Sequence, residues 1–559
     1  MAYIRSPQLL RSRNFLCHIA RPFTSATNLH GPVGLEGDSV RGIGNPQPFP
    51  LPQAGIYSPI PHVRPLLPPV ISKQQTQSPD PAGNDATTVL AQSHEHFQSA
   101  VQAEAVTTPA YHMGSKFERV PYWQKIGRWK DVSEEQFLSY RWNTAKDVQG
   151  KIKLYDFLEE MLPEKIPAKG QKDPNVNRED FIKDVMDGIA MAPMSIRLTP
   201  HILASVDWSN PINDPLSKQF IPKKSTFQPD HPKLTLDSLH EQEDSPSSSH
   251  CPLYCRYCTR SYAVGADTET VSKASLKPKR ARWNTMLEHI ANTSTIQDVV
   301  ISGGDSYSLA PEHLRMIGDR LMDIEHVRRF RVATKGLCVS PSRTLDPNDG
   351  WTDELIRLSN IGRQRGKHVA LHTHFNHPNE FSWVSREAAQ KLFQNSVVVR
   401  NQSVLLKGVN DDAETMGDLI RELGDNNIIP VSSPNTSPIL LPVQPNWQQY
   451  YLYAGDMVKG VEDLRTPLQT ILDLECQLRG SIAGFLMPQF VVDLPGGGGK
   501  RLASSYRSYD RTTGVSTFVA PAVKGAGKVD KVYEYYDPLG SSSQVDAANL
   551  EGVVLDGGA

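Results

Sequence analysis

Short runs of β-branched and aromatic residues alternate with stretches of helical apolar spacing through the second half of the chain. Each run has strand length, and most are followed by a segment in which apolar residues recur every three or four positions. Repeated strand-then-helix units predict a parallel sheet, and so an α/β fold. The expected strands are 298–302, 330–334, 368–375, 396–406 and 427–431, and the expected helices begin at 311 and 352 and cover 385–394 and 413–423.

The region before these units, 116–239, has a mainly helical pattern. Ser133 and Gln136 have the spacing of a capping box, which predicts a helix start at this point. Residues 152–162 have apolar positions at helical spacing, and 196–215 has the pattern of a short helix followed by a turn-rich loop.

The two ends of the chain have compositions that do not favour a packed core. Residues 1–35 contain four arginines and many hydroxyl residues, and the first carboxylate is Glu36. No uninterrupted apolar run follows the arginines, which favours a mitochondrial transit peptide over a plain disordered tail, and hence a location in the mitochondrial matrix. Residues 36–115, rich in Pro, Gly, Gln and Ser, are expected to be a disordered linker, and 541–559 a disordered tail.

Charge and cysteine usage narrow the classes of function. The chain has 59 basic and 61 acidic side chains, without the basic excess of a general nucleic-acid binder. No apolar run has the length needed to span a bilayer, so we expect neither a nucleic-acid nor a membrane partner. Three of the six cysteines are scattered, which argues against a disulfide framework.

The other three cysteines, Cys251, Cys255 and Cys258, follow the pattern C-x3-C-x2-C. Three thiolates so close in sequence can bind one metal centre. Zinc prefers four ligands, and His250 could supply the fourth. An iron–sulfur cube held by three thiolates would leave one iron open to chelate a substrate.

Two further motifs follow expected strands, where ligands bind in parallel α/β folds. Ser302 to Asp305 form the glycine-containing turn "SGGD", and His374 lies at the end of the strand at 368–375 as either a site residue or a hydrogen-bonded structural histidine. A strand-like run from Phe485 leads into "LPGGGGK", where Lys500 could bind phosphate, form an imine, or be a solvated lysine in a flexible linker.

These motifs resemble those of the radical S-adenosylmethionine (SAM) superfamily. The three-cysteine spacing has an aromatic residue, Tyr257, before the third cysteine, and "SGGD" is similar to the superfamily's glycine-rich SAM site. Over roughly 117–540 the chain resembles the lysine 2,3-aminomutase family more specifically. The segments that carry this resemblance are, in order, "CPLYCRYCTR", "DVVISGGD", "HTHFNHPNE", "NQSVLLKGVND", "EDLRTP" and "FVVDLPGGGGK".

The resemblance implies a partial (β/α)6 radical SAM barrel over 240–482, after the helical region 116–239, and a C-terminal segment, 483–540, that carries the cofactor lysine. It implies a [4Fe–4S] cluster on the three cysteines and pyridoxal 5′-phosphate (PLP) as an imine on Lys500. The SAM or PLP contacts that it implies are Tyr257, Ser302, Gly303, Gly304, Asp305, Gln402 and Ser403.

The implied reaction is the conversion of L-lysine to β-lysine through a 5′-deoxyadenosyl radical, so the chain is expected to be an isomerase. By the same resemblance, Arg260 binds the substrate α-carboxylate, and Asp456 and Asp493 bind the ε-ammonium group. Arginine or another basic amino acid would also suit two carboxylates. An inactive homologue that binds metal structurally is a further alternative. The implied partners are an electron donor such as a ferredoxin or flavodoxin, and a second copy of the chain.

Three departures from the family pattern stand out. The family has an apolar strand before the cysteine loop, whereas here 240–251 leads almost directly into Cys251, so the first barrel strand is predicted to be missing or truncated. Residues 432–449 form an apparent insertion, expected to be a surface loop before the strand that carries Asp456. No cysteine follows Cys476, so the extra C-terminal zinc site of some relatives is not expected.

Overall fold

The computed structural model describes eight stretches of the chain: 4–5, 119–168, 175–241, 244–245, 249–274, 280–428, 451–520 and 530–540. Contacts group Met1–Arg21 with Phe117–Ala559 as one compact unit and Pro22–Lys116 as another, which lies outside the described residues. Several expected segments also lie outside the described residues: the linker at 36–115, the insertion at 432–449 and the tail at 541–559. Of the expected strand at 427–431 only residues 427 and 428 are described, and of 1–35 only Ile4–Arg5.

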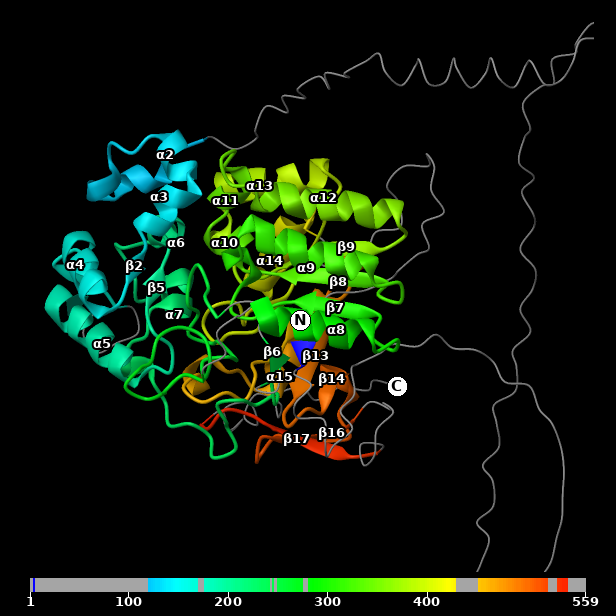
Figure 1. The fold of residues 1–559 in the computed structure, drawn as a ribbon. Coiled ribbons are helices and arrows are strands. Elements are labelled where there is room, and N and C mark those ends of the chain that lie inside the picture. Colours follow the sequence, from blue (N-terminus) through cyan, green and yellow to red (C-terminus); the bar gives the residue numbers. More distant parts are fainter. Residues whose placement is uncertain are drawn as a thin grey trace, which may run out of the picture. The chain divides into compact units, whose positions relative to one another are not determined.

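Parallel strands follow one another in chain order, as the alternating pattern predicts. One sheet pairs β7 (Asp298–Ile301), β8 (Arg329–Ala333), β9 (His368–Thr373) and β10 (Val398–Asn401) in that order, all parallel. A second pairs β11 (Ser403–Val404), β12 (Tyr451–Tyr453) and β13 (Gln489–Leu494) in parallel, with β14 (Gly499–Leu502) antiparallel at its edge. Strands β7, β8 and β9 lie side by side in Figure 1.

Strands β10 and β11 are parts of one extended segment. Only Gln402 separates them; β10 pairs with β9, and β11 pairs with β12. The expected single strand at 396–406 is therefore split, and its two halves connect the two sheets. The parallel order thus runs without interruption from β7 to β13.

Helices connect the parallel strands. Their starts reflect the local sequence: Pro311 occupies the first turn of α9, and the side chains of Ser382 and Asp412 cap α13 and α14. Helix α12 packs against α9 and β9. The helices of this part are α8 (Arg280–Ala291), α9 (Pro311–Asp323), α10 (Gly336–Val339), α11 (Ser342–Leu345), α12 (Trp351–Gln364), α13 (Trp383–Gln394), α14 (Ala413–Asp425) and α15 (Leu468–Leu478).

The region before the sheet is mainly helical, and the capping box at Ser133 and Gln136 is present as predicted. This region contacts the sheet region through Tyr140, whose backbone N–H donates to Asp346 at 2.8 Å and whose ring lies under the Arg343 guanidinium at 4.2 Å. Its helices are α2 (Glu134–Leu138), α3 (Tyr140–Ala145), α4 (Lys151–Met161), α5 (Arg178–Met191), α6 (Pro200–Ser205) and α7 (Pro215–Phe220), coloured cyan to green in Figure 1.

The remaining strands are short and antiparallel. The pairs are β2 (Val148–Gln149) with β5 (Arg197–Leu198), and β3 (Lys165–Pro167) with β4 (Asn175–Asn177). A three-stranded sheet orders β15 (Ser508–Asp510), β16 (Val515–Val519) and β17 (Val532–Tyr536).

The segment before the cysteine loop is described only in part. Between Leu234 and Cys251 the described stretches hold one strand, β6 (Asp244–Ser245), which pairs antiparallel with β1 (Ile4–Arg5). Strand β7 is the edge strand of its sheet. The prediction that a strand begins at Phe485 is wrong, because Gly484–Leu486 is a 3-10 turn. Strand β13 begins at Gln489, directly after Pro488, which has no N–H to donate to a neighbouring strand.

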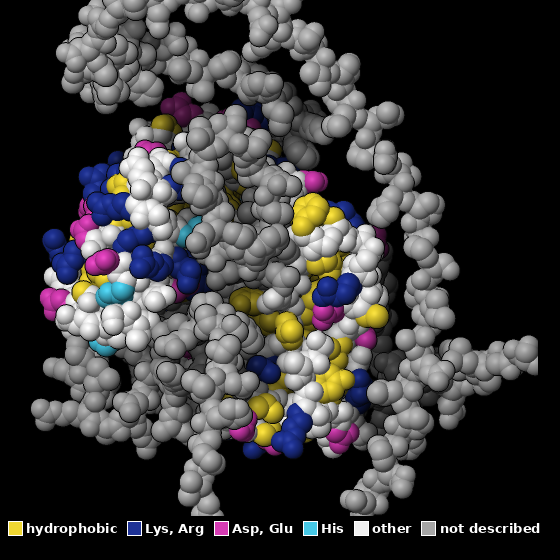
Figure 2. Space-filling view, turned by 90° about the vertical axis from the view of Figure 1, so that its right-hand side faces the viewer, with side chains coloured by type: hydrophobic (Ala, Val, Ile, Leu, Met, Phe, Trp, Pro, Cys, Tyr) yellow, Lys and Arg dark blue, Asp and Glu magenta, His cyan; other side chains and the backbone are white. Residues whose placement is uncertain are grey.

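The described surface has mixed charge. Basic and acidic side chains both occur on the face shown in Figure 2, in keeping with the near balance of the whole chain. Among the helices that the structure describes, none combines the length and apolar character needed to cross a bilayer.

The sheet core should dominate stability. Phe330, in β8, is fully buried, whereas Phe393, in α13, is 44% exposed. We expect Phe330→Ala to lower the free energy of unfolding by about 3–5 kcal/mol, because it leaves a cavity in the sheet core. Phe393→Ala, the matched control, should change it by less than about 0.5 kcal/mol in urea unfolding. Equal losses in the two variants would contradict this account of the core.

Candidate active site

The predicted site residues gather where the parallel strands end. Ser302 to Asp305 follow β7, His374 follows β9, and Gln402 and Ser403 lie at the end of β10. Asp456 was expected on a strand, but it lies in the loop after β12. Asp493 is near the end of β13. These residues come together because the carboxyl ends of parallel strands lie at one edge of a sheet.

The cysteine loop lies directly against the glycine turn. The backbone N–H of Asp305 donates to the carbonyl of His250 at 2.9 Å, just before the first cysteine. A Cβ atom on Gly304 would lie 2.6 Å from the same carbonyl oxygen, closer than any side chain tolerates. The glycine is therefore required for this contact between the turn and the loop.

The three cysteines of the loop suit a metal cluster. All three are free thiols and are partly exposed. Burial within the loop raises the pKa of each, that of Cys255 to about 12, so they become thiolates only if a cationic centre replaces their protons. No three His, Cys, Asp or Glu side chains of the described stretches meet around one point as ligands of a single ion. A cube has a different requirement, since each thiolate binds its own iron.

The carboxylate of Asp305 already accepts two hydrogen bonds from the backbone. Its carboxylate accepts the backbone N–H of Tyr307 at 2.7 Å and that of Lys335 at 2.9 Å. It thus connects the end of β7 with the end of β8, and burial raises its pKa. The residue lies where the motif placed it, but it holds the two strand ends together.

Arg260 lies in the same part of the site. Its guanidinium donates to the carbonyl of Gly303 at 2.6 Å, to the hydroxyl of Ser302 at 3.4 Å and to Glu241 Oε2 at 2.8 Å. The side chains of Arg260 and Glu241 are 11% and 8% exposed, so this is a buried ion pair. Glu241 was not among the expected site residues.

A second buried arginine fixes the cysteine loop. Arg256, between the first two cluster positions and the third, donates to both carboxylate oxygens of Asp463, at 3.2 and 2.9 Å. Asp463 belongs to the segment "EDLRTP", whose Glu462 in turn pairs with Arg465 at 2.9 Å. Glu462 also accepts the backbone N–H of Leu539 at 2.8 Å, so this segment contacts both the cysteine loop and the C-terminal part of the chain.

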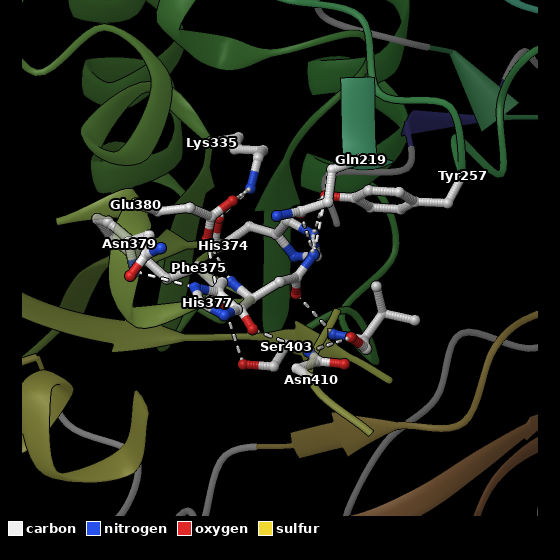
Figure 3. Close-up of polar contacts among 12 residues, drawn as sticks. Gln219, Tyr257, Lys335, His374, Phe375, His377, Asn379, Glu380, Ser403 and Asn410 are labelled. Atoms are coloured by element: carbon white, nitrogen blue, oxygen red, sulfur yellow. Dashed lines mark hydrogen bonds and ion pairs between the residues drawn. The ribbon is translucent and has the colours of Figure 1, made fainter. Parts of the chain in front are cut away.

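Tyr257 is held by a polar network, shown in Figure 3. Its hydroxyl lies 3.2 Å from Oε1 of Gln219 and 3.2 Å from Nε2 of His374, and it accepts from Nδ2 of Asn376 at 2.8 Å. Burial, reinforced by the nearby Lys335 ammonium, lowers the pKa of His374, so its imidazole is neutral. These contacts support the structural interpretation of His374.

Lys335 extends this network beneath the cysteine loop. Its ammonium donates to Glu380 at 3.0 Å and to the carbonyl of His374 at 2.8 Å (Figure 3). Burial disfavours the charge of Lys335, but Cys338, Glu380 and Cys255 outweigh burial and raise its pKa. A buried cation therefore lies close to one of the cluster cysteines.

The two residues expected after β10 both bond to the protein backbone, Ser403 through its hydroxyl and Gln402 through its N–H. The Ser403 hydroxyl donates to the carbonyl of Phe375 at 2.7 Å and accepts from Asn401 at 2.8 Å. The backbone N–H of Gln402 donates to Thr373 at 2.9 Å. Ser403 thus takes part in the join between β9 and β11.

Lys500 is positioned by a β-hairpin. Strands β13 and β14 pair so that Asp493 and Lys500 lie directly opposite each other. The turn between them contains three of the four glycines, and the fourth, Gly499, begins β14; Gly497 has a φ of 74°, in the left-handed region that glycine tolerates. A Cβ on Gly498 would lie 2.6 Å from the Cβ of Leu494. The glycine run is therefore a tight turn rather than a linker.

Lys500 and two carboxylates form a charged group at this hairpin. The Lys500 ammonium lies 2.7 Å from Oδ2 of Asp493, and 43% of its side chain is exposed. Burial would lower its pKa, but Asp493 and Asp456 outweigh burial and raise it. Burial, reinforced by Asp493, raises the pKa of Asp456 to about 8, and within the described structure its buried Oδ1 atom has no hydrogen-bond partner.

The structure therefore brings most of the predicted residues into two connected groups. The cysteine loop, the glycine turn and Arg260 form one, and Lys500 with its two aspartates forms the other. Glu241 connects them, because it pairs with Arg260 and acts electrostatically on Lys500 and Asp456. Sequence reasoning missed Glu241, Lys335 and Glu380; the one available signal was that Lys335 lies in the turn just after β8, two residues beyond its end.

Comparison with known proteins gives three informative relatives. The chain is 31% identical over 388 residues to the L-lysine 2,3-aminomutase of Clostridium subterminale, covering 66% of this chain and 79% of that protein. It is 31% identical over 386 residues to the L-lysine 2,3-aminomutase of Acetoanaerobium sticklandii, with the same coverages. It is 27% identical over 392 residues to the glutamate 2,3-aminomutase of Clostridioides difficile, covering 67% and 79%. No family model matches the chain.

Asp456 should make stability depend on pH. Its pKa of about 8 means that the folded protein keeps a proton that the unfolded chain releases above about pH 4. The contribution of Asp456 to stability is therefore most favourable in acid and falls as the pH rises toward 8. Asp456→Asn cannot titrate, so its loss of unfolding free energy between about pH 5 and about pH 8 should be smaller by about 1–3 kcal/mol.

Urea unfolding of the protein without added cofactors at the two pH values measures this difference. Asp425→Asn, on the exposed surface of α14, is the matched control and should follow the wild type. The same pH dependence in Asp456→Asn and the wild type would show that the Asp456 carboxyl has an ordinary pKa.

Proposed function

Because this chain belongs to the lysine 2,3-aminomutase family, we propose that it moves the 2-amino group of L-lysine to C3 and so forms β-lysine. Members of this family are isomerases that act on small molecules and use a [4Fe–4S] cluster, SAM and PLP. The observation that carries the proposal is the position of Lys500 beside Asp493 and within electrostatic reach of Asp456.

The residues that would hold the cofactors are those of the two connected groups. Cys251, Cys255 and Cys258 would bind the cluster, and Lys500 would bind PLP. When bound, the cluster with SAM supplies the radical chemistry that removes a hydrogen atom, and PLP supplies a conjugated system for the migrating amino group. We assign the SAM side of the site to Tyr257, Ser302, Gly303, Gly304 and Asp305, with Gln402 and Ser403 at the strand end beside it.

Lys500 must lose a proton before its nitrogen can bond to a cofactor carbonyl. Asp493 Oδ2, 2.7 Å from the Lys500 nitrogen, is placed to take up that proton and release it to water, which restores the Asp493 carboxylate. Once Lys500 is no longer a cation, Asp493 loses its ion-pair partner. The carboxylate can then pair with the ε-ammonium of lysine, so that one cation replaces another at the same site.

The charges of the site favour a basic substrate. Burial and, after it, the Asp493 carboxylate raise the pKa of Asp456, and a substrate ammonium between the two acids would favour the ionised form of Asp456. A side-chain carboxylate, as in glutamate, would be repelled by Asp493. Arg260 would bind the α-carboxylate. Two carboxylates would also accept the guanidinium of arginine, which is the alternative substrate.

The fold that we propose is a partial (β/α)6 barrel over 240–482 whose first strand is missing or truncated. Its support is the unbroken parallel order from β7 to β13 and the edge position of β7. The helical region 116–239 and the lysine segment 483–540 would flank it. We further propose a ferredoxin or flavodoxin as electron donor, and assembly of two or more copies.

The direct test is anaerobic. The protein is reconstituted with iron, sulfide and PLP, given SAM, reductant and L-lysine, and analysed for β-lysine by chromatography. L-Arginine and L-glutamate, in parallel and in competition, identify the preferred substrate; we expect L-lysine, and no turnover of glutamate. Turnover of arginine alone would support the alternative, and absence of turnover with all three would indicate an inactive homologue.

Lys500→Ala should abolish the absorption of bound PLP and all product formation, while the iron and sulfide content stays within the wild-type range. Lys130→Ala, an exposed lysine before α2, is the control and should retain both. If Lys500→Ala still shows the absorption of bound PLP, another amine holds the cofactor.

We also propose that the protein acts in the mitochondrial matrix. Residues 1–35 fused to a fluorescent protein should direct it to mitochondria, because the segment combines four arginines with no acid. Replacing the four arginines by glutamine should leave the fusion in the cytosol. Equal distribution of the two fusions would exclude a targeting role for the arginines.

A further inference from the structure

Glu241 is a third acidic residue of the site, and its closest contact is with the residue assigned to the substrate carboxylate. Its Oε2 atom accepts from Nε of Arg260 at 2.8 Å. The two residues are only 7% and 9% exposed, so water screens their attraction poorly. Glu241 lies in the stretch 240–251, where this chain departs from the family pattern.

The carboxylate of Glu241 also acts on the other group of the site. It contributes to the raised pKa of Asp456 and to that of Lys500. The site therefore contains three acids, Glu241, Asp456 and Asp493, and two bases, Arg260 and Lys500. With Asp456 protonated, the carboxylates of Glu241 and Asp493 balance the two cations, so the site holds no surplus positive charge to attract a ligand carboxylate.

A substrate carboxylate would meet an arginine that is already bonded. Nε of Arg260 donates to Glu241, and NH1 donates to the carbonyl of Gly303 and to Ser302. The bidentate geometry that arginine offers a carboxylate uses adjacent N–H groups. To use Nε, the substrate must displace Glu241, which would leave a buried carboxylate without its ion-pair partner, and this is strongly unfavourable.

We propose that Glu241 is a specificity-determining residue that competes with the substrate α-carboxylate for Arg260. It thereby weakens the preference of the site for an amino acid over the diamine of the same length. This inference rests on the role proposed for Arg260. It distinguishes Glu241 from a residue that only orients the guanidinium, because an orienting residue would strengthen substrate binding.

The test compares two ligands that differ only in the carboxylate. The dissociation constants of L-lysine and 1,5-diaminopentane are measured by anaerobic calorimetry on the reconstituted holoenzyme, wild type and Glu241→Gln. We expect L-lysine to bind at least ~10-fold more tightly to the variant, the scale of one charge-assisted hydrogen bond. Binding of 1,5-diaminopentane should change by less than about twofold or weaken, because it does not use Arg260.

Two further variants make the result specific. In an Arg260→Gln background, Glu241→Gln should not increase the affinity for L-lysine, because no guanidinium remains for which Glu241 and the substrate could compete. Glu269→Gln, an exposed acid beyond the cysteine loop, removes the same charge from the surface and should leave both affinities unchanged. Glu241→Ala should shift L-lysine affinity in the same direction as Glu241→Gln.

Unchanged or weaker binding of L-lysine to both Glu241 variants would overturn the inference and make Glu241 a support for Arg260. If the wild type does not bind L-lysine, the comparison uses L-arginine and L-glutamate, which carry the same α-carboxylate; no gain with any of the three would also overturn it. A gain in affinity without formation of β-lysine would instead contradict the proposed function and leave the role of Glu241 intact.

Discussion

The site depends on the parallel order of strands β7 to β10, whose carboxyl ends meet at one edge of their sheet. Buried apolar side chains such as Val300, Val332 and Leu371 give these strands a common core. The turns that follow the strands carry Asp305 and His374. Because the strands are parallel and adjacent in chain order, these residues meet at one edge although they are far apart in sequence.

Collecting charged groups at one edge requires that each be compensated. Arg256 is paired with Asp463, Lys335 with Glu380, Arg260 with Glu241 and Lys500 with Asp493. Three of these pairs are buried, so removing one partner would leave the other as an uncompensated buried charge. The arrangement thus fixes the cysteine loop, the glycine turn and the lysine hairpin relative to one another, which is what positioning of several cofactors demands.

The sequence was informative wherever a local signal decides the structure. The capping box at Ser133, the strand–helix order and the positions of Asp305 and Lys500 after strands follow from periodicity and turn chemistry. The start of β13 differs from the prediction because the local pattern at Phe485 is also compatible with a turn, and Pro488 cannot donate a backbone hydrogen bond to a neighbouring strand. The partners of these residues were not predictable from the chain, because the Arg260–Glu241 and Arg256–Asp463 pairs join segments through tertiary packing alone.

The single residue between β10 and β11 has a mechanical consequence. The sheet that carries the glycine turn and the sheet that carries Lys500 share one covalent strand, and Gln402 is its joint. With its N–H held by Thr373, this residue offers few torsions about which one sheet could swing against the other. The two sheets are therefore covalently coupled, and a change in the angle between them would require a change in the backbone torsions at Gln402.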